Sequence, residues 1–132
     1  MSAPERERIV VGVDGSELSK VALRWAHREA ALHGADLDVL HVASPSEDTA
    51  EALADTRRLA AVVEQVVGDD ASVPVHHHVV EGPPAQALIE AARHADLVVV
   101  GSHGHRGYGS LRLGSVSQQV ADHAPCPVVV VR

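Results

Sequence analysis

The sequence predicts an α/β fold in which a doubly wound, five-stranded parallel sheet carries helices on both faces. Short runs rich in Val, Ile and Leu alternate with longer segments whose apolar residues recur every three or four positions. The first of these runs, Ile9–Asp14, is β-branched and closed by a turn, which is typical of a buried parallel strand. The 132 residues suit one compact domain. We therefore expect a single domain over residues 1–132, with a flexible N-terminus at residues 1–8.

The first third of the chain predicts a strand, a helix and a second strand. The first strand is expected over Ile9–Asp14, a β-branched run closed by an Asp-Gly-Ser turn. The helix should begin after Ser16, which can accept a hydrogen bond as N-cap, and end at Gly34. Leu37–Val42 is the second predicted strand.

The middle of the chain repeats this alternation. The polar stretch Ala43–Asp48 precedes a long helical pattern that ends before Gly68. Val73–Val80 predicts the third strand, and Pro83–His94 predicts a helix that starts with proline, where a missing N–H costs nothing. Leu97–Val100 predicts the fourth strand.

The last third predicts a long loop, a helix and a closing strand. The loop should cover Gly101–Gly114, the helix Ser115–His123 and the fifth strand Val128–Val131. Strands that alternate with helices form right-handed crossovers and a parallel sheet. In such a sheet ligands bind beyond the carboxyl ends of the strands, where the winding reverses.

Composition excludes several classes of protein. The net charge is −7, with 18 acidic residues against 11 Lys and Arg, which argues against binding to nucleic-acid phosphates. No apolar run approaches the roughly 20 residues that cross a bilayer, and the charged N-terminus does not resemble a secretion signal. A single cysteine suits a reducing compartment. We expect a cytoplasmic protein that binds neither nucleic acid nor membrane.

The loop between the fourth strand and the fourth helix is the strongest functional candidate. Its five glycines between Gly101 and Gly114 would let the backbone approach a ligand closely. The amides of Ser115, Val116 and Ser117 would open the next helix, whose dipole favours a phosphate. A solvent-exposed loop followed by a capped helix is the alternative. The length of the loop favours a functional role, because typical connections have about 2 to 6 residues.

Two familiar phosphate-binding motifs are absent from the sequence. A Walker A loop needs Gly-Lys-Ser or Gly-Lys-Thr, but the only lysine is Lys20, within the first predicted helix. The segment after the first strand, Gly12-Val13-Asp14-Gly15-Ser16-Glu17, does not match a dinucleotide fingerprint. The sequence therefore predicts neither a P-loop nor an NAD-type Rossmann enzyme.

These residues resemble the ATP-binding branch of the universal stress protein family. Gly101-x2-Gly104-x9-Gly114-Ser115 matches the glycine motif of that branch, spacing included. The opening segment Val10–Ser16 and the closing segment Ala124–Val131 resemble the corresponding parts of the family. The resemblance covers essentially the whole chain. It implies the family's fold, which is similar to that of the adenine nucleotide alpha hydrolases, with strand order 3-2-1-4-5.

The resemblance also implies a set of nucleotide-binding residues. Asp14 would lie near the ribose hydroxyls or a metal ion, Val42 would flank the adenine, and Gly114 would permit close approach of the phosphates. Mg²⁺ would accompany ATP, ADP or AMP. The implied set is Gly12, Val13, Asp14, Val42, Gly101, Ser102, His103, Gly104, His105, Arg106, Gly107, Gly114, Ser115, Val116 and Ser117. Asp14 also suits ordinary turn chemistry, and Ser115 and Ser117 also suit a helix cap and a surface hydroxyl.

The histidines do not predict a metal site. His76 and His78 would share one face of a strand while His77 faces the other, so the three cannot converge on one ion, and a solvated edge strand is expected instead. His103 and His105 lie in the glycine loop, where either could contact a phosphate.

The predicted function is regulatory binding of ATP with at most slow hydrolysis, because no nucleophile or metal-hydrolase motif is present. The stress role comes from the resemblance, as does a homodimer formed through the exposed edge Val128–Val131. A protein partner, not identified by the sequence, would respond to the nucleotide state. A nucleotidyl- or phosphoryl-transfer enzyme and a nucleotide-free dimeric scaffold remain the alternatives.

Overall fold

The computed structural model describes residues 6–43, 49–103 and 114–132, and within them it has five strands and four helices. In chain order these are β1 (Arg8–Gly12), α1 (Glu17–His33), β2 (Asp36–Ala43), α2 (Thr49–Val67), β3 (Val75–Glu81), α3 (Pro84–Ala92), β4 (Leu97–Gly101), α4 (Ser115–His123) and β5 (Val128–Val131). Every predicted strand and helix is present.

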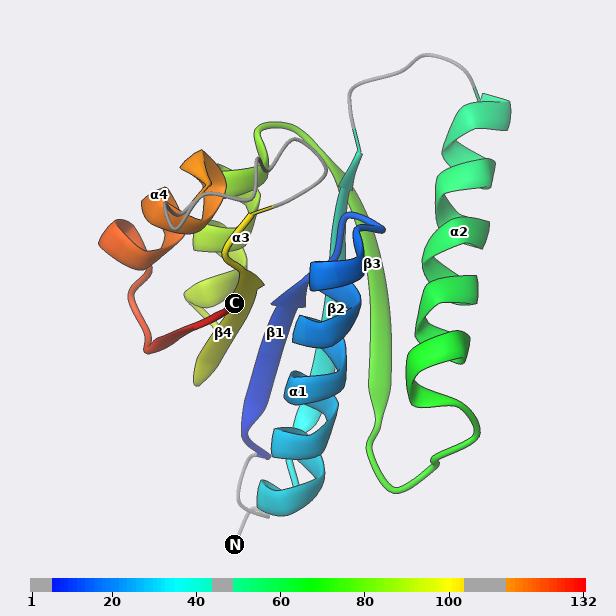
Figure 1. Ribbon diagram of the computed structural model, residues 1–132, viewed down its shortest axis with the longest axis horizontal. Helices are drawn as coiled ribbons and strands as arrows, with labels where there is room; N and C mark the ends of the chain where they lie inside the picture. The colour runs from blue at the N-terminus through cyan, green and yellow to red at the C-terminus, as the bar shows by residue number, and fades with distance from the viewer. Residues whose placement is uncertain (1–5, 44–48, 104–113) are drawn as a thin grey trace, which may run out of the picture.

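The strands form one parallel sheet with the order β3-β2-β1-β4-β5, which confirms the predicted fold. Figure 1 shows α1 and α2 on one side of this sheet and α3 and α4 on the other. The winding reverses between β1 and β4, because β2 and β3 lie on one side of β1 and β4 and β5 on the other. A crevice for a ligand is expected at the carboxyl ends of these two strands.

Two aliphatic cores hold the layers together, one on each face of the sheet. Alternate residues of β1 point to opposite faces, so Val11 packs against α1 and α2 while Val10 packs against α3 and α4. The first core takes Ala22, Leu23 and other residues of α1, and the second takes residues such as Leu88 of α3. The small alanines of α1, such as Ala22, let this helix lie close to the sheet.

Local sequence explains how α1 begins and ends. The side chain of Ser16 accepts a hydrogen bond from the amide of Ser19 at 3.2 Å, as expected of an N-cap. Gly34 has the left-handed backbone (φ 63°) that commonly ends a helix. Both predicted ends of this helix are confirmed.

Three predicted elements were wrong by two residues at one end. β1 ends at Gly12 and not at Asp14, because the chain turns away from the ladder before Gly15, whose φ is 84°. β3 begins at Val75, because Pro74 has no N–H to give to the sheet. α3 begins at Pro84, since Pro83 has an extended backbone, and it ends at Ala92.

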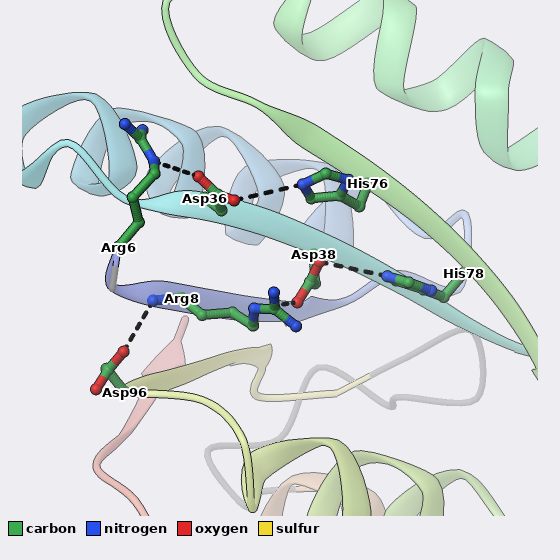
Figure 2. Close-up of polar contacts among 7 residues, drawn as sticks. All are labelled: Arg6, Arg8, Asp36, Asp38, His76, His78 and Asp96. Atoms are coloured by element: carbon green, nitrogen blue, oxygen red, sulfur yellow. Dashed lines mark hydrogen bonds and ion pairs between the residues drawn. The ribbon is translucent and has the colours of Figure 1, made fainter. Parts of the chain in front are cut away.

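Part of the α3/α4 face, near the amino ends of β1, β2 and β3, carries charged and imidazole side chains. Figure 2 shows Asp36 and Asp38 of β2 facing His76 and His78 of β3, with Arg8 of β1 beside Asp38. His76 and His78 are exposed, and β3 is an edge of the sheet, as predicted.

Candidate functional site

A cavity of about 170 Å³ lies at the carboxyl ends of β1 and β4, where the winding reverses. One side is formed by the turn that joins β1 to α1, the other by the end of β4 and the start of α4. The residues that line it are Gly12, Val13, Asp14, Ser19, Leu40, Val42, Pro84, Leu88, Val100, Gly101, His103, Val116 and Ser117. Eight of these belong to the set that the sequence singled out.

The start of α4 presents backbone amides to this region. Gly114 is the N-cap and has no side chain to accept a hydrogen bond, and the first bond within the helix runs from Gln118 to the Gly114 carbonyl at 3.0 Å. The amides of Ser115, Val116 and Ser117 have no acceptor within the described part of the chain. Because such amides and the helix dipole attract anions, this helix start has the chemistry of a phosphate site.

Contacts between the start of α4 and the end of β4 hold these amides in place. The Gly114 amide donates to the Ser102 carbonyl at 2.5 Å. The hydroxyl of Ser117, which is buried, donates to the Gly101 carbonyl. That hydroxyl hydrogen is therefore directed at the protein, so Ser117 would meet a ligand through its backbone amide.

Gly114 lies against the segment that follows β4. A Cβ atom at this position would lie 3.4 Å from both the His103 Cα and the Ser102 carbonyl oxygen, which is an ordinary van der Waals contact, so an alanine would fit and a larger side chain would have little room on this side. Gly114, Ser102 and Ser115 do not line the cavity itself, although Ser102 and Ser115 are each adjacent to a residue that does.

Asp14 faces the cavity from the turn after β1. Its Oδ1 accepts the Ser16 amide at 2.9 Å, and its own amide lies 3.4 Å from the Ser19 hydroxyl. Asp14 thus performs the turn chemistry that the sequence offered as an alternative, and it also lines the cavity.

The remaining wall of the cavity is apolar. Leu40 and Val42 come from one face of β2, Val100 from β4, and Pro84 and Leu88 from the first half of α3. The sequence analysis missed Ser19, Leu40, Pro84, Leu88 and Val100. Leu40 could have been found, because it lies two residues before Val42 and therefore shares its face. Together these side chains form a surface suited to a flat, weakly polar ring.

Some predicted site residues lie outside the described residues. These are Gly104, His105, Arg106 and Gly107. Within the ranges the structure does describe, no three His, Cys, Asp or Glu side chains are grouped so that they could hold a metal ion. None of the described helices is both long and apolar enough to cross a membrane.

Residues 5–132 match the model of the universal stress protein family. A universal stress protein of Mycolicibacterium smegmatis is 42% identical over 133 residues, which cover 94% of this chain and 45% of that protein. The chain spans about half the length of most of the curated relatives it matches.

Solved structures resemble the chain over almost all of its length. The universal stress protein UspA from Lactobacillus plantarum has a TM-score of 0.82 and 26% identity, covering 98% of this chain and 100% of its own. A universal stress protein solved in complex with cAMP has a TM-score of 0.79 and 29% identity, covering 96% of this chain and 97% of its own.

Proposed function

This chain belongs to the universal stress protein family, and on that premise we propose that it binds an adenine nucleotide between β1 and β4. ATP is the preferred candidate, with ADP and AMP as alternatives. The observation that carries the proposal is the start of α4, where the amides of Ser115, Val116 and Ser117 have no acceptor within the described residues. A phosphate would complete the hydrogen bonding of these amides.

The walls of the cavity suit the other parts of the nucleotide when its phosphates lie at the start of α4. The apolar surface of Leu40, Val42 and Leu88 suits the adenine ring, and the carboxylate of Asp14 suits the ribose hydroxyls. The neighbour that was solved with cAMP supports an adenine ligand, because it is 29% identical over almost the whole chain.

The size of the cavity fits part of a nucleotide. Pockets for whole drug-sized ligands have volumes of about 300 to 1,000 Å³, whereas the described walls enclose about 170 Å³. The base and ribose would fill this space, and the phosphates would extend along the start of α4. Mg²⁺ would be held mainly by phosphate oxygens and water, as it commonly is, with Asp14 as the nearest candidate carboxylate.

The bound nucleotide would act as a regulatory signal. Among the described residues that line the cavity, Asp14 and His103 are the only titratable ones, and Asp14 already accepts a hydrogen bond from Ser16. A cavity with so few acid–base groups favours slow hydrolysis at most. We place this module in the cytoplasmic stress response, as a homodimer joined through β5 that reports nucleotide state to a protein partner.

Equilibrium dialysis with ATP, ADP and AMP tests the proposal on the wild type, Gly114→Ala and Gly114→Val. The wild type should bind at least one of the three nucleotides. The valine side chain should collide with His103 and weaken binding at least tenfold, whereas the alanine Cβ fits at 3.4 Å and should retain most of the affinity. Thermal melting verifies that both variants are folded. If the wild type binds none of the three nucleotides, the proposal is wrong and a nucleotide-free dimeric scaffold is favoured instead.

A further inference from the structure

His41 lies on β2 beside the turn that forms one wall of the cavity. Its Nδ1 is 2.9 Å from the carbonyl oxygen of Val13. Because a carbonyl oxygen can only accept, Nδ1 must carry the hydrogen. Both the neutral Nδ1–H form and the protonated ring can donate in this way, so the bond does not require a particular charge on His41.

The imidazole of His41 supplies a hydrogen-bond donor to the Val13 carbonyl, which lies just beyond the end of β1. β1 ends at Gly12, although the Val13 amide still donates to the Leu40 carbonyl at 2.9 Å. The Val13 carbonyl follows the last ladder position, and the imidazole of His41 supplies its donor. Both polar backbone groups of Val13 are thus fixed by β2, one by the backbone and one by the side chain.

Fixing the Val13 carbonyl also fixes the next amide. A trans peptide is planar and its C=O and N–H point in opposite directions, and all peptides in the described chain are trans. The orientation of the Val13 carbonyl toward His41 therefore sets the direction of the Asp14 N–H and the position of the Asp14 Cα. The next residue, Gly15, has a φ of 84° and allows several other conformations, so sterics alone would not select this one.

We propose that His41 is a positioning residue of the nucleotide site, acting through the Val13 carbonyl to orient the Val13–Asp14 peptide that lines the cavity. The inference rests on the proposed nucleotide-binding function. His41 does not line that cavity, so its effect on the ligand is exerted through the backbone.

The position tolerates substitution well enough to be tested. His41 is half-buried, and on its other side it borders a second cavity of about 490 Å³, together with Lys20, Asp55 and Arg58. A smaller side chain at residue 41 therefore opens onto existing space and leaves no enclosed void. Valine suits a strand but cannot donate, whereas asparagine carries an amide nitrogen at the place of Nδ1.

The test is calorimetric titration with ATP of the wild type, His41→Val, His41→Asn and the control His77→Val, an exposed position on β3. The loss of one positioning hydrogen bond should weaken binding by roughly tenfold in His41→Val. His41→Asn should recover most of that loss, and the control should bind as the wild type does. Thermal melting curves identify a temperature at which all four proteins are folded. If His41→Val does not fold, His41→Leu is used in its place.

The outcomes distinguish a failure of nucleotide binding itself from a failure of the positioning role of His41. A wild type without affinity for ATP, ADP or AMP would refute the proposed function itself. If the wild type binds ATP and His41→Val binds it equally well, the positioning role of His41 is refuted, while the proposed nucleotide binding is not. If His41→Asn binds as weakly as His41→Val, the hydrogen bond is not responsible, and the inference fails as well.

Discussion

The carboxylate of Asp36 lies between an arginine and a histidine at the amino end of β2. Its Oδ1 is 2.5 Å from the Arg6 Nε, and its Oδ2 is 3.5 Å from the His76 Nε2 (Figure 2). The hydrogen bond from Arg6 lowers the pKa of Asp36 most, burial acts in the opposite direction, and the hydrogen bond to His76 lowers the pKa further. The ionised carboxylate is thus favoured in the folded state.

We predict that this arrangement stabilises the protein at neutral pH and not in acid. A carboxyl group whose pKa is lower in the folded state contributes stability above its unfolded pKa, ordinarily 3.8. The contribution is lost as the pH falls through the lower, folded value. Asp36→Asn should therefore reduce the free energy of unfolding by about 1 kcal/mol or less at pH 7, since Arg6 is half-exposed. Urea denaturation between pH 7 and pH 2 measures this difference.

The matched control for that experiment is Asp69→Asn. Asp69 is exposed, and the described residues include no ion pair with it. The same change of charge at Asp69 should leave the free energy of unfolding nearly unchanged. An Asp36→Asn effect that is equally large at pH 2 and pH 7 would contradict the ionic origin of the stabilisation.

Individual site residues differ in how far the sequence could predict them. Gly101 begins the glycine motif and Val116 directly follows it, so both can be recognised locally, and the structure brings both to the cavity. Leu88 and Pro84 reach the same cavity from α3, and no local pattern distinguishes them from other apolar helix residues. Their place depends on how α3 packs on the sheet, which is a tertiary property. The contribution of each residue to ligand binding stays a prediction.

At the scale of elements, β5 is an edge strand whose four valines are all partly exposed. The carbonyls of Pro127 and Val131 accept hydrogen bonds from the amides of Val98 in β4 and Ser102 directly after it, at 3.0 and 2.7 Å. Residues alternate along a strand, so the N–H and C=O groups of Val128 and Val130 point away from β4. A second copy could pair with this edge by adding its own β5.

We predict that Val130→Pro converts a dimer into a monomer without unfolding it. Proline removes the outward N–H of Val130, which the dimer would use, and leaves the bonds to β4 intact. Val130→Ala keeps that N–H and should remain dimeric. Light scattering after size-exclusion chromatography should give twice the mass of one chain for the wild type and Val130→Ala. For Val130→Pro it should give the mass of one chain. A monomeric wild type would contradict the proposed dimer.

The histidine-rich strand shows where element-level prediction succeeds and where it ends. Its alternation placed His76 and His78 on one face, and its polarity favoured a solvated edge, which the structure confirms for β3. The pairing of these histidines with Asp36 and Asp38 was not predicted. It follows from the register in which β3 lies beside β2, and a strand's own residues do not determine that register.

For the whole molecule, the alternation of strands and helices was sufficient to predict a parallel sheet with two helical layers. Val11 and Val99 stand in unbroken apolar runs, which are typical of strands buried on both faces, and both residues are buried in the structure. Such a run can be recognised from neighbouring residues in the sequence. The strand order β3-β2-β1-β4-β5 was predicted by the family resemblance and is confirmed. Periodicity alone does not determine it, because order depends on which crossovers pass over which face.

Amide NMR during an ATP titration shows whether the amides at the start of α4 bind the phosphates of an adenine nucleotide. Such binding should give saturable chemical-shift changes at Ser115, Val116 and Ser117 and at Val13 and Asp14, with little change along β3. If saturating ATP leaves the amides of Ser115, Val116 and Ser117 unshifted, the proposed phosphate site at α4 is wrong.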